Sequence, residues 1–156
     1  MIRLFLIVLF LTSFTYVERL DHKSLYNEIL EQNLEFPEVV FAQAILESSD
    51  FKSDICRNNY NLFGMRVAKS RKTFAIGKRK GYAKFKDYGY SISDYALYQE
   101  MVLKKKKHTK SSYIKYISTK YSRDPGYTGK IKKIMVKYNH IFYDTSSFRN
   151  DGIFDN

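Results

Sequence analysis

A strongly apolar stretch that ends on a glutamate does most to limit how this chain can fold. From Pro37 to Glu47 the apolar residues recur at helical spacing, and Pro37 suits a first helical turn because its missing N–H is not needed there. The stripe expected to face the core consists of Val40, Phe41, Ala44, Ile45 and Ser48. Gln43 and Glu47 lie one turn apart on a neighbouring face, and the polar residues 48–50 end the apolar pattern. The sequence therefore predicts a buried helix over 37–47 with a carboxyl group at its border.

Glu47 is the candidate general acid in this pattern. A carboxyl group at the edge of a core loses part of its hydration, which favours the neutral form and raises its pKa. An acid that donates a proton near neutral pH needs such a pKa. The helix pattern alone fits equally an ordinary solvated glutamate at a helix end.

Two segments further along the chain contain residues that are typical of turns. In the segment 58–64, asparagine side chains can bond nearby backbone and Gly64 accepts a positive φ. Leu62 and Phe63 would pack this turn against the core and leave its amides facing outward, where amide hydrogen bonding would suit the N-acetyl and hydroxyl groups of a sugar. The alternative is an ordinary Asn-rich loop. Residues 124–126 (Asp-Pro-Gly) predict the second turn, and Tyr121 before it could equally be a core aromatic.

Four segments, in this order, resemble the bacterial and phage glucosaminidases of glycoside hydrolase family 73. They are Ala42–Ser48, Asn61–Met65, Ser91–Tyr98 and Tyr121–Ile131. The resemblance covers roughly residues 35–143. It implies that Glu47 is the catalytic acid, that the turn at Asn61–Met65 lies against it, and that Tyr121 lines the cleft near the scissile bond.

The resemblance also implies a fold and an activity. The fold would be mainly α with a small β-hairpin lobe (α+β), lysozyme-like. The activity would be that of an endo-β-N-acetylglucosaminidase that cleaves β-1,4 bonds of peptidoglycan. The catalytic candidates are Glu47, Tyr121 and Asp87, and the substrate-binding candidates are Gln43, Asn61, Phe63, Asp124 and Tyr127. We expect no metal and no cofactor, because the chain has one cysteine and three scattered histidines.

The sequence departs from the family in its second catalytic group. Many members carry a second glutamate on the hairpin lobe, but residues 66–86 contain no Asp or Glu here. Asp87 could activate water if the lobe closes, or the 2-acetamido oxygen of the substrate could attack the anomeric carbon. A third account is a protein that binds glycan with little or no turnover. We favour the acetamido route, with Tyr121 orienting the acetamido group.

Two other functions compete with the glucosaminidase interpretation. A muramidase or a lytic transglycosylase, as in phage endolysins, also relies on one helix-end glutamate. A basic module that binds the cell wall without catalysis would explain the charge and not the turns.

A net charge of +11 on 156 residues indicates attraction to a polyanion. Residues 104–108 form the densest cationic run, and Lys78, Arg79 and Lys80 on the predicted hairpin could hold an anionic cell-wall polymer. No helix-turn-helix, RNP or zinc spacing accompanies the charge. The expected partners are therefore peptidoglycan glycan strands and anionic wall polymer, with no nucleic acid, and the expected state is a monomer.

The chain length allows one domain preceded by a targeting segment. Residues 1–19 contain Arg3, an apolar run over 4–11 and small polar residues, a pattern typical of a signal peptide or a short membrane anchor. This pattern predicts export to the periplasm, cell envelope or medium. The catalytic domain would span 20–143, and 144–156 would be a flexible tail. The expected helices cover 22–32, 37–47, 91–103, 111–120 and 127–142, and the hairpin strands cover 73–76 and 82–85.

Overall fold

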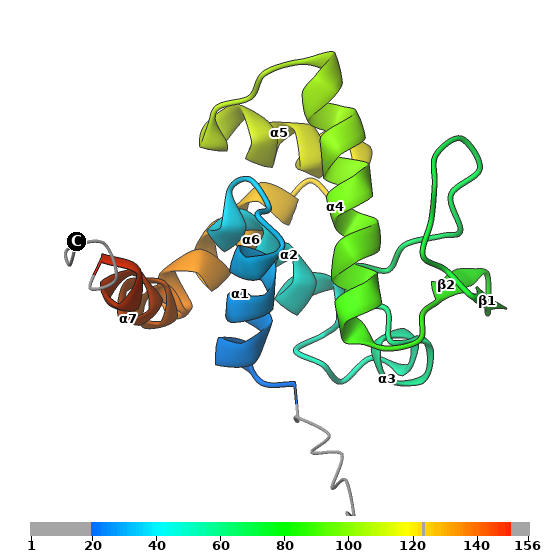
Figure 1. Ribbon diagram of the computed structural model, residues 1–156. Coiled ribbons are helices and arrows are strands. Elements are labelled where there is room, and N and C mark those ends of the chain that lie inside the picture. The colour runs from blue at the N-terminus through cyan, green and yellow to red at the C-terminus, as the bar shows by residue number, and fades with distance from the viewer. Residues whose placement is uncertain (1–19, 123, 151–156) are drawn as a thin grey trace, which may run out of the picture.

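A computed structural model describes residues 20–122 and 124–150 of the chain. The described part is mostly helical, with one two-stranded antiparallel sheet (Figure 1). Its elements in chain order are α1 (His22–Glu31), α2 (Pro37–Glu47), α3 (Asp54–Asn59), β1 (Gly77–Arg79), β2 (Tyr82–Lys84), α4 (Tyr88–Lys105), α5 (Lys110–Lys120), α6 (Tyr127–Lys137) and α7 (Asn139–Asn150). The expectation of a mainly α protein with a small hairpin lobe is confirmed.

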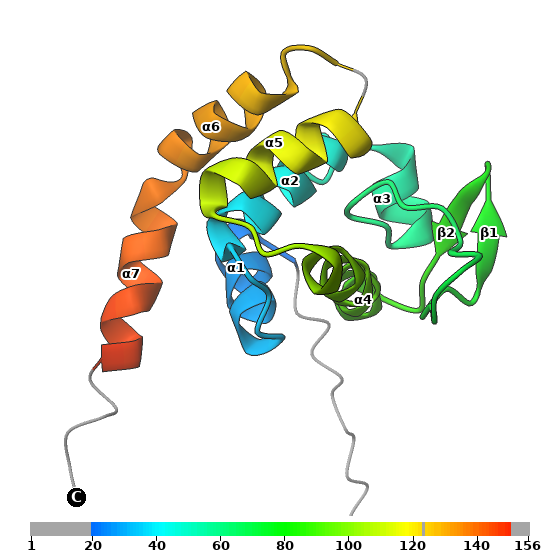
Figure 2. The ribbon, with the colours of Figure 1, turned by 90° about the horizontal axis from the view of Figure 1, so that it is seen from above.

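Helix α2 is the central element of the core. Every residue from Val39 to Ile45 is buried, including the polar Gln43, so the helix is enclosed around its whole circumference rather than along one stripe. Phe41 belongs to a cluster shared with α1, whereas Val39 and Ala42 pack with residues of α5 and α6. Figure 2 shows α2 enclosed in this way, between α1 and α5. The C-terminal end of α2, where Glu47 lies, is therefore held by neighbours on several sides.

The hairpin forms a lobe on the side of the molecule opposite α7 (Figure 1). Strand β1 pairs with β2 with Lys78 opposite Ala83, and both turn residues between the strands have positive φ, as in a two-residue type I′ turn. On its other edge β2 is bonded to the preceding turn, because the amides of Ala83 and Phe85 donate to the carbonyls of Met65 and Asn59 at 2.9 Å each. Strand β1 is thus the outer strand of the lobe.

The first strand of the hairpin begins at Gly77, four residues later than the sequence predicted. The segment 73–76 has strand-forming residues, but the carboxylate of Asp94 binds the Thr73 hydroxyl at 2.7 Å and the Phe74 amide at 2.8 Å. These bonds hold the start of the predicted strand against α4, so the ladder begins only where the Ile76 amide donates to Lys84.

Helix α3 lies where no helix was expected, and its last two residues belong to the segment 58–64 that was predicted as a turn. It is six residues long, and the Ser53 side chain accepts a hydrogen bond from the Cys56 amide at its start. Helix α4 begins at Tyr88, three residues earlier than expected, because Asp87 caps it. Asn58 and Asn59 had pointed to a turn and here end a helix, whereas Asp87, a candidate catalytic group in the sequence, caps one.

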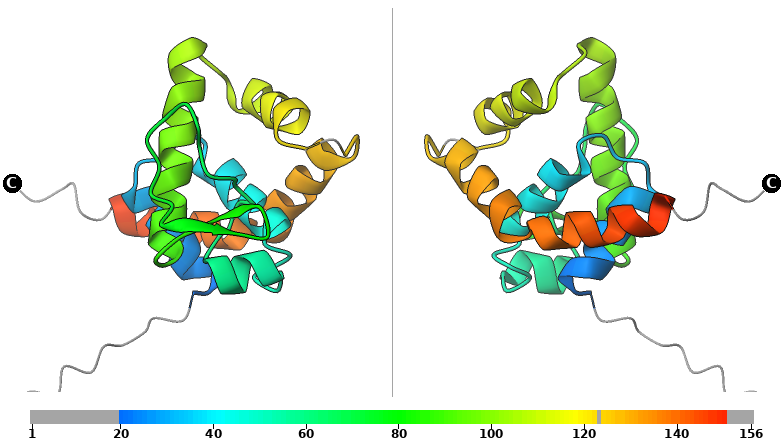
Figure 3. Two further views of the ribbon diagram at one scale, coloured as in Figure 1. Left: turned by 90° about the vertical axis from the view of Figure 1, so that its right-hand side faces the viewer. Right: turned by 90° about the vertical axis from the view of Figure 1, so that its left-hand side faces the viewer.

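The C-terminal region forms two helices where the sequence predicted one. Helix α6 ends at Lys137 and α7 continues to Asn150, past the start of the expected flexible tail at residue 144. Figure 3 shows α6 and α7 following one another around the outside of α1 and α2. The predicted targeting segment at 1–19 lies outside the described residues, as does the end of the predicted tail at 151–156. In the described part of the chain, no helix has both the length and the apolar character needed to cross a membrane.

Candidate active site

Glu47 is the last residue of α2, and its side chain is half-buried. The hydroxyl of Tyr127, the first residue of α6, donates a hydrogen bond to Glu47 Oε1 at 2.8 Å. Burial raises the pKa of Glu47 above its ordinary value, and the bond from Tyr127 acts in the opposite direction with a smaller effect. The carboxyl group therefore has the raised pKa expected from its position at the border of the core.

Gly64 lies against the second oxygen of this carboxyl group. Its φ is +62°, a left-handed conformation that glycine adopts without strain, and a Cβ built there would lie 3.6 Å from Glu47 Oε2. The turn containing Gly64 thus contacts the helix-end glutamate, as the family resemblance implied. A residue with a side chain would be strained at this position and would cover Oε2.

Tyr121 joins the same cluster from the end of α5. Its hydroxyl donates a hydrogen bond of 2.5 Å to the backbone carbonyl of Phe63, the residue before Gly64. Burial first, and then the negative charge of Glu47, hold the pKa of Tyr121 well above its ordinary value. The phenol therefore stays neutral, with its proton given to Phe63 and its oxygen lone pairs available to accept.

Asp124 and Tyr127 act together at the start of α6. The Asp124 carboxylate accepts from the Gly126 amide at 2.8 Å and pairs with Lys130 at 2.5 Å, and Lys130 first and the amide second lower its pKa. These contacts fix the turn from which Tyr127 extends toward Glu47. Asp124 therefore helps to position Tyr127 by fixing the backbone of this turn, and its carboxylate is engaged by Gly126 and Lys130.

Gln43 is fully buried one turn before Glu47. Its Oε1 accepts a hydrogen bond of 2.5 Å from the Tyr95 hydroxyl, which also contacts the Tyr113 hydroxyl at 2.8 Å. The residue is also close enough to Tyr127 to counteract part of the rise in that hydroxyl's pKa, a rise caused first by burial and then by the charge of Glu47. Gln43 therefore supports the site from the protein interior, and its burial leaves it no exposed surface for a substrate.

Asn61 and Phe63 shape the turn from inside the protein. Asn61 is buried, its side-chain amide donates to the carbonyls of Met65 and Ala83 at 2.9 Å each, and its oxygen accepts from the Met65 amide at 3.0 Å. The ring of Phe63 is fully buried and stacks on Tyr95, with the ring centroids 4.2 Å apart. Both side chains are fully used within the protein, so we do not retain them as substrate-contacting groups.

Asp87 caps α4 and is exposed to solvent. Its Oδ1 accepts a hydrogen bond from the Tyr90 amide at 3.1 Å. Asp87 also lines a hollow of about 290 Å³ together with Leu20 and with Ser24 and Glu28 of α1. Glu47 is not among the residues that line that hollow. These contacts give Asp87 a structural role as the cap of α4, and the water-activating role that the sequence suggested stays a prediction.

The sequence interpretation missed an internal ion pair between the lobe and α4. Arg71 donates to both carboxylate oxygens of Asp94, at 3.2 and 2.8 Å, and the Asp94 side chain is fully buried. On the hairpin itself, Arg79 and Lys80 pair with Asp54 at 2.9 and 3.1 Å. Two of the three cations assigned to wall polymer thus have an acidic partner within the protein.

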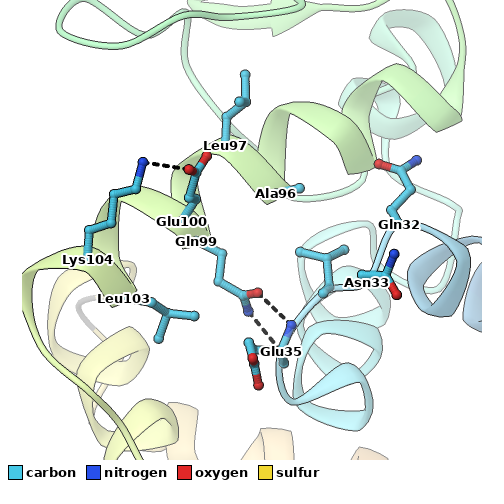
Figure 4. A pocket seen from close by; sticks show the side chains of 10 residues that line it. Gln32, Asn33, Glu35, Ala96, Leu97, Gln99, Glu100, Leu103 and Lys104 are labelled. Atoms are coloured by element: carbon cyan, nitrogen blue, oxygen red, sulfur yellow. Dashed lines mark hydrogen bonds and ion pairs between the residues drawn. The ribbon is translucent and has the colours of Figure 1, made fainter.

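Among the described residues, no metal site accompanies the cluster around Glu47, and the hollow in Figure 4 lies elsewhere. Within residues 20–122 and 124–150, no group of His, Cys, Asp and Glu side chains is placed to hold a metal ion. Figure 4 shows a hollow of about 480 Å³ between the segment 32–35 and α4, where the Gln99 side chain bonds both backbone groups of Glu35 at 2.8 Å. Glu47 does not line it.

Comparison with known proteins identifies the fold and the family to which these features correspond. The family described as "Mannosyl-glycoprotein endo-beta-N-acetylglucosaminidase" matches residues 23–140. Protein bax of Escherichia coli (strain K12) is 42% identical over 71 residues, which cover 45% of this chain and 26% of that protein. The match thus spans about a quarter of this relative.

A solved structure shares the fold over most of its length. The catalytic domain of the autolysin Auto from Listeria monocytogenes superposes with a TM-score of 0.56 and 23% identity, covering 78% of this chain and 84% of that chain. The expected lysozyme-like fold is confirmed.

Proposed function

This chain belongs to the mannosyl-glycoprotein endo-β-N-acetylglucosaminidase family of glycoside hydrolases, and on that basis we propose that it cleaves β-1,4 bonds in the glycan strands of peptidoglycan. The cut would leave N-acetylglucosamine at the new reducing end. The observation that carries the proposal is the position of Glu47, whose carboxyl group is half-buried, has a raised pKa and contacts Tyr127 and Gly64.

In this proposal Glu47 protonates the glycosidic oxygen of the leaving group. Oε1 accepts the hydrogen bond from Tyr127, so the transferable proton of the neutral acid is carried by Oε2. Oε2 faces Gly64, where the absence of a side chain leaves room for the sugar oxygen to approach. Tyr127 orients the carboxyl group and stabilises the carboxylate left after the proton has gone.

The group that attacks the anomeric carbon would be the 2-acetamido oxygen of the substrate. The lobe segment 66–86 has no acid, Asp87 caps α4, and Asp94 is buried in its pair with Arg71. Tyr121 is neutral, so it cannot act as a base near neutral pH. Since its proton is donated to Phe63, its oxygen can accept the acetamido N–H and aim the carbonyl oxygen at the anomeric carbon.

The products decide between this activity and its competitors. We expect mass spectrometry of fragments released from purified sacculi to show reducing-end N-acetylglucosamine. Reducing-end N-acetylmuramic acid would identify a muramidase, and anhydro-N-acetylmuramic acid a lytic transglycosylase. Binding to sacculi without release of soluble sugar would identify a non-catalytic wall-binding module.

The role of Glu47 is tested by Glu47→Gln, which keeps the shape of the side chain and removes the proton. The variant should still bind sacculi but release no soluble sugar. Glu31→Gln, an exposed glutamate at the end of α1, is the matched control and should keep full activity. Equal release by Glu47→Gln and Glu31→Gln would refute the assignment.

The acetamido route has its own test. A glycan whose acetamido groups are replaced by trifluoroacetamido groups has a weaker nucleophile, so cleavage should slow strongly if the acetamido oxygen attacks and only slightly if water attacks.

The proposed substrate lies outside the cytoplasmic membrane, so the proposal includes export, for which residues 1–19 have the sequence pattern of a signal.

A further inference from the structure

A basic hollow lies between the lobe and the outer face of α4, apart from the Glu47 cluster. Its volume is about 420 Å³. It is lined by Arg71, Lys72, Leu97, Glu100, Met101, Lys104 and Lys105. Leu97, Glu100 and Lys104 also line the hollow in Figure 4, so the two depressions meet along this stretch of α4.

The charges around this hollow are strongly unequal. Four of its residues are cations and one is an acid, Glu100, which pairs with Lys104 at 2.6 Å on the exposed surface. Arg71 is committed to Asp94 in the interior. Lys72, in the segment before the hairpin, and Lys105, the last residue of α4, are exposed, and no acidic partner accompanies them in the described part of the chain. The rim therefore offers two cations for an anionic ligand.

The floor of the hollow is apolar. Leu97 and Met101 lie one turn apart on α4, and both are half-buried. A ligand that fits must place small apolar groups on these side chains and anionic groups on the lysines. A phosphate polymer has charge without the apolar groups, whereas a short peptide with alanine methyls and free carboxylates has both.

Helix α4, which lines the hollow, contacts the candidate active site through two aromatic rings. Tyr98 follows Leu97 on α4, and its ring contacts that of Tyr121 edge to face, with centroids 5.9 Å apart. The Tyr121 hydroxyl in turn bonds the Phe63 carbonyl beside Gly64 and Glu47. A group attached to a sugar bound near Glu47 could thus reach the hollow by passing over Tyr98.

We propose that this hollow binds the stem peptide of the glycan substrate through its carboxylates, so that the protein prefers peptide-bearing over bare glycan. This inference rests on the proposed function, because stem peptides are carried by peptidoglycan. Lys72 and Lys105 bind the carboxylates, and Leu97 and Met101 contact the alanine methyls. The two lysines determine specificity and take no part in bond cleavage.

The test reverses both rim charges in one chain, by Lys72→Glu with Lys105→Glu. The matched control is Lys132→Glu with Lys133→Glu, two exposed lysines of α6 that change the net charge equally. The substrates are sacculi with their stem peptides and the same glycan after an amidase has removed them. On peptide-bearing glycan we expect KM to rise about tenfold for the rim variant only, because two attractions become repulsions. On bare glycan the two variants should behave alike.

Equal KM values for the two variants on peptide-bearing glycan would overturn the inference, and so would an equal loss by the rim variant on both substrates. A second measurement is independent of catalysis. In an NMR titration of the wild-type chain, a soluble stem tetrapeptide should shift the methyl signals of Leu97 and Met101, and the rim variant should show no such shift.

Glycerol phosphate is the competing ligand in the same titration. Shifts caused by glycerol phosphate and not by the tetrapeptide would replace the peptide by a phosphate polymer and overturn the inference. Tetrapeptide binding by a chain that cleaves neither glycan would support the hollow and reject the proposed function, so the two failures are distinguishable.

Discussion

The Tyr127 hydroxyl reaches across 80 residues of sequence to donate a 2.8 Å hydrogen bond to Oε1 of Glu47. This bond joins the start of α6 to the end of α2 at the point where the carboxyl group meets solvent. It opposes the effect of burial on the pKa of Glu47, so the pH range in which the acid stays protonated depends on both.

Removing this hydroxyl should move the pH dependence of cleavage. Burial raises the pKa of Glu47 and Tyr127 lowers it, so Tyr127→Phe leaves the raising effect unopposed. The alkaline limb of the kcat/KM profile, which reports loss of the acid's proton, should move to higher pH. The maximal rate should fall about tenfold, as one oriented hydrogen bond is lost. Tyr90→Phe, at an exposed tyrosine of α4, should change neither quantity, and an unmoved limb in Tyr127→Phe would contradict this account.

Glu47 should also make stability depend on pH. Its pKa is raised in the folded protein above the ordinary 4.5, so the folded state holds the proton more tightly than the unfolded state. The resulting stabilisation is complete below the unfolded pKa and is lost as pH rises through the folded pKa. Glutamine does not titrate, so the melting temperature of Glu47→Gln relative to wild type should increase as the pH rises from below the unfolded pKa of glutamate through the raised pKa of the folded state. Chemical or thermal unfolding at several pH values measures this, with Glu31→Gln as the control that should show a flat difference.

Two glycines with positive φ separate backbone strain from proximity to the acid. Gly64 has φ +62°, and a Cβ at this position would lie 3.6 Å from Glu47 Oε2. Gly81 has φ +81°, and a Cβ at this position would meet no atom within 4 Å. Gly64→Ala and Gly81→Ala should each lose about 1–2 kcal/mol of unfolding free energy, because alanine is strained in this region. Only Gly64→Ala should lose cleavage beyond what its stability explains, since its methyl group covers Oε2. Similar activity in the two variants would show that the approach to Oε2 is not restricted.

The internal ion pair should matter far more for stability than the exposed one. Asp94→Asn leaves Arg71 without its buried counter-ion and weakens the bonds to Thr73 and Phe74, at a cost of about 3–5 kcal/mol in unfolding free energy. Asp54→Asn removes the partner of Arg79 and Lys80 at the surface, where water screens the pair, and should change stability little. Urea unfolding of both variants compares them directly, and equal losses would contradict the difference in burial.

The helix that carries Glu47 could be predicted because its information is local. Pro37 at the start, the apolar run and the polar end identify α2 to the residue, and burial of the run places Glu47 at the border of the core. The hairpin was predicted from Gly77 and Gly81, which bound a basic loop, but its first strand was placed too early. That error has a distant cause, because Asp94 of α4 takes the amide of Phe74 away from the ladder.

The partners of the site residues could not be predicted from one sequence. Nothing near Asp94 indicates that it lies in the interior, because a polar residue between Ser93 and Tyr95 fits an exposed helix position equally well. Asn61 and Gln43 were substrate-binding candidates because of the family resemblance. Their buried bonds to Ala83 and Tyr95 come from segments 22 and 52 residues away, and only the folded chain brings these segments together.

The bonds between β2 and the turn at 59–65 have a mechanical consequence. The side chains of Asn59 and Asn61 both hold the carbonyl of Ala83, and the same turn ends with Gly64 on the carboxyl group of Glu47. The hairpin lobe and the candidate general acid Glu47 are therefore connected through this turn. A force applied to the hairpin would therefore also act on the backbone beside Gly64 and Glu47.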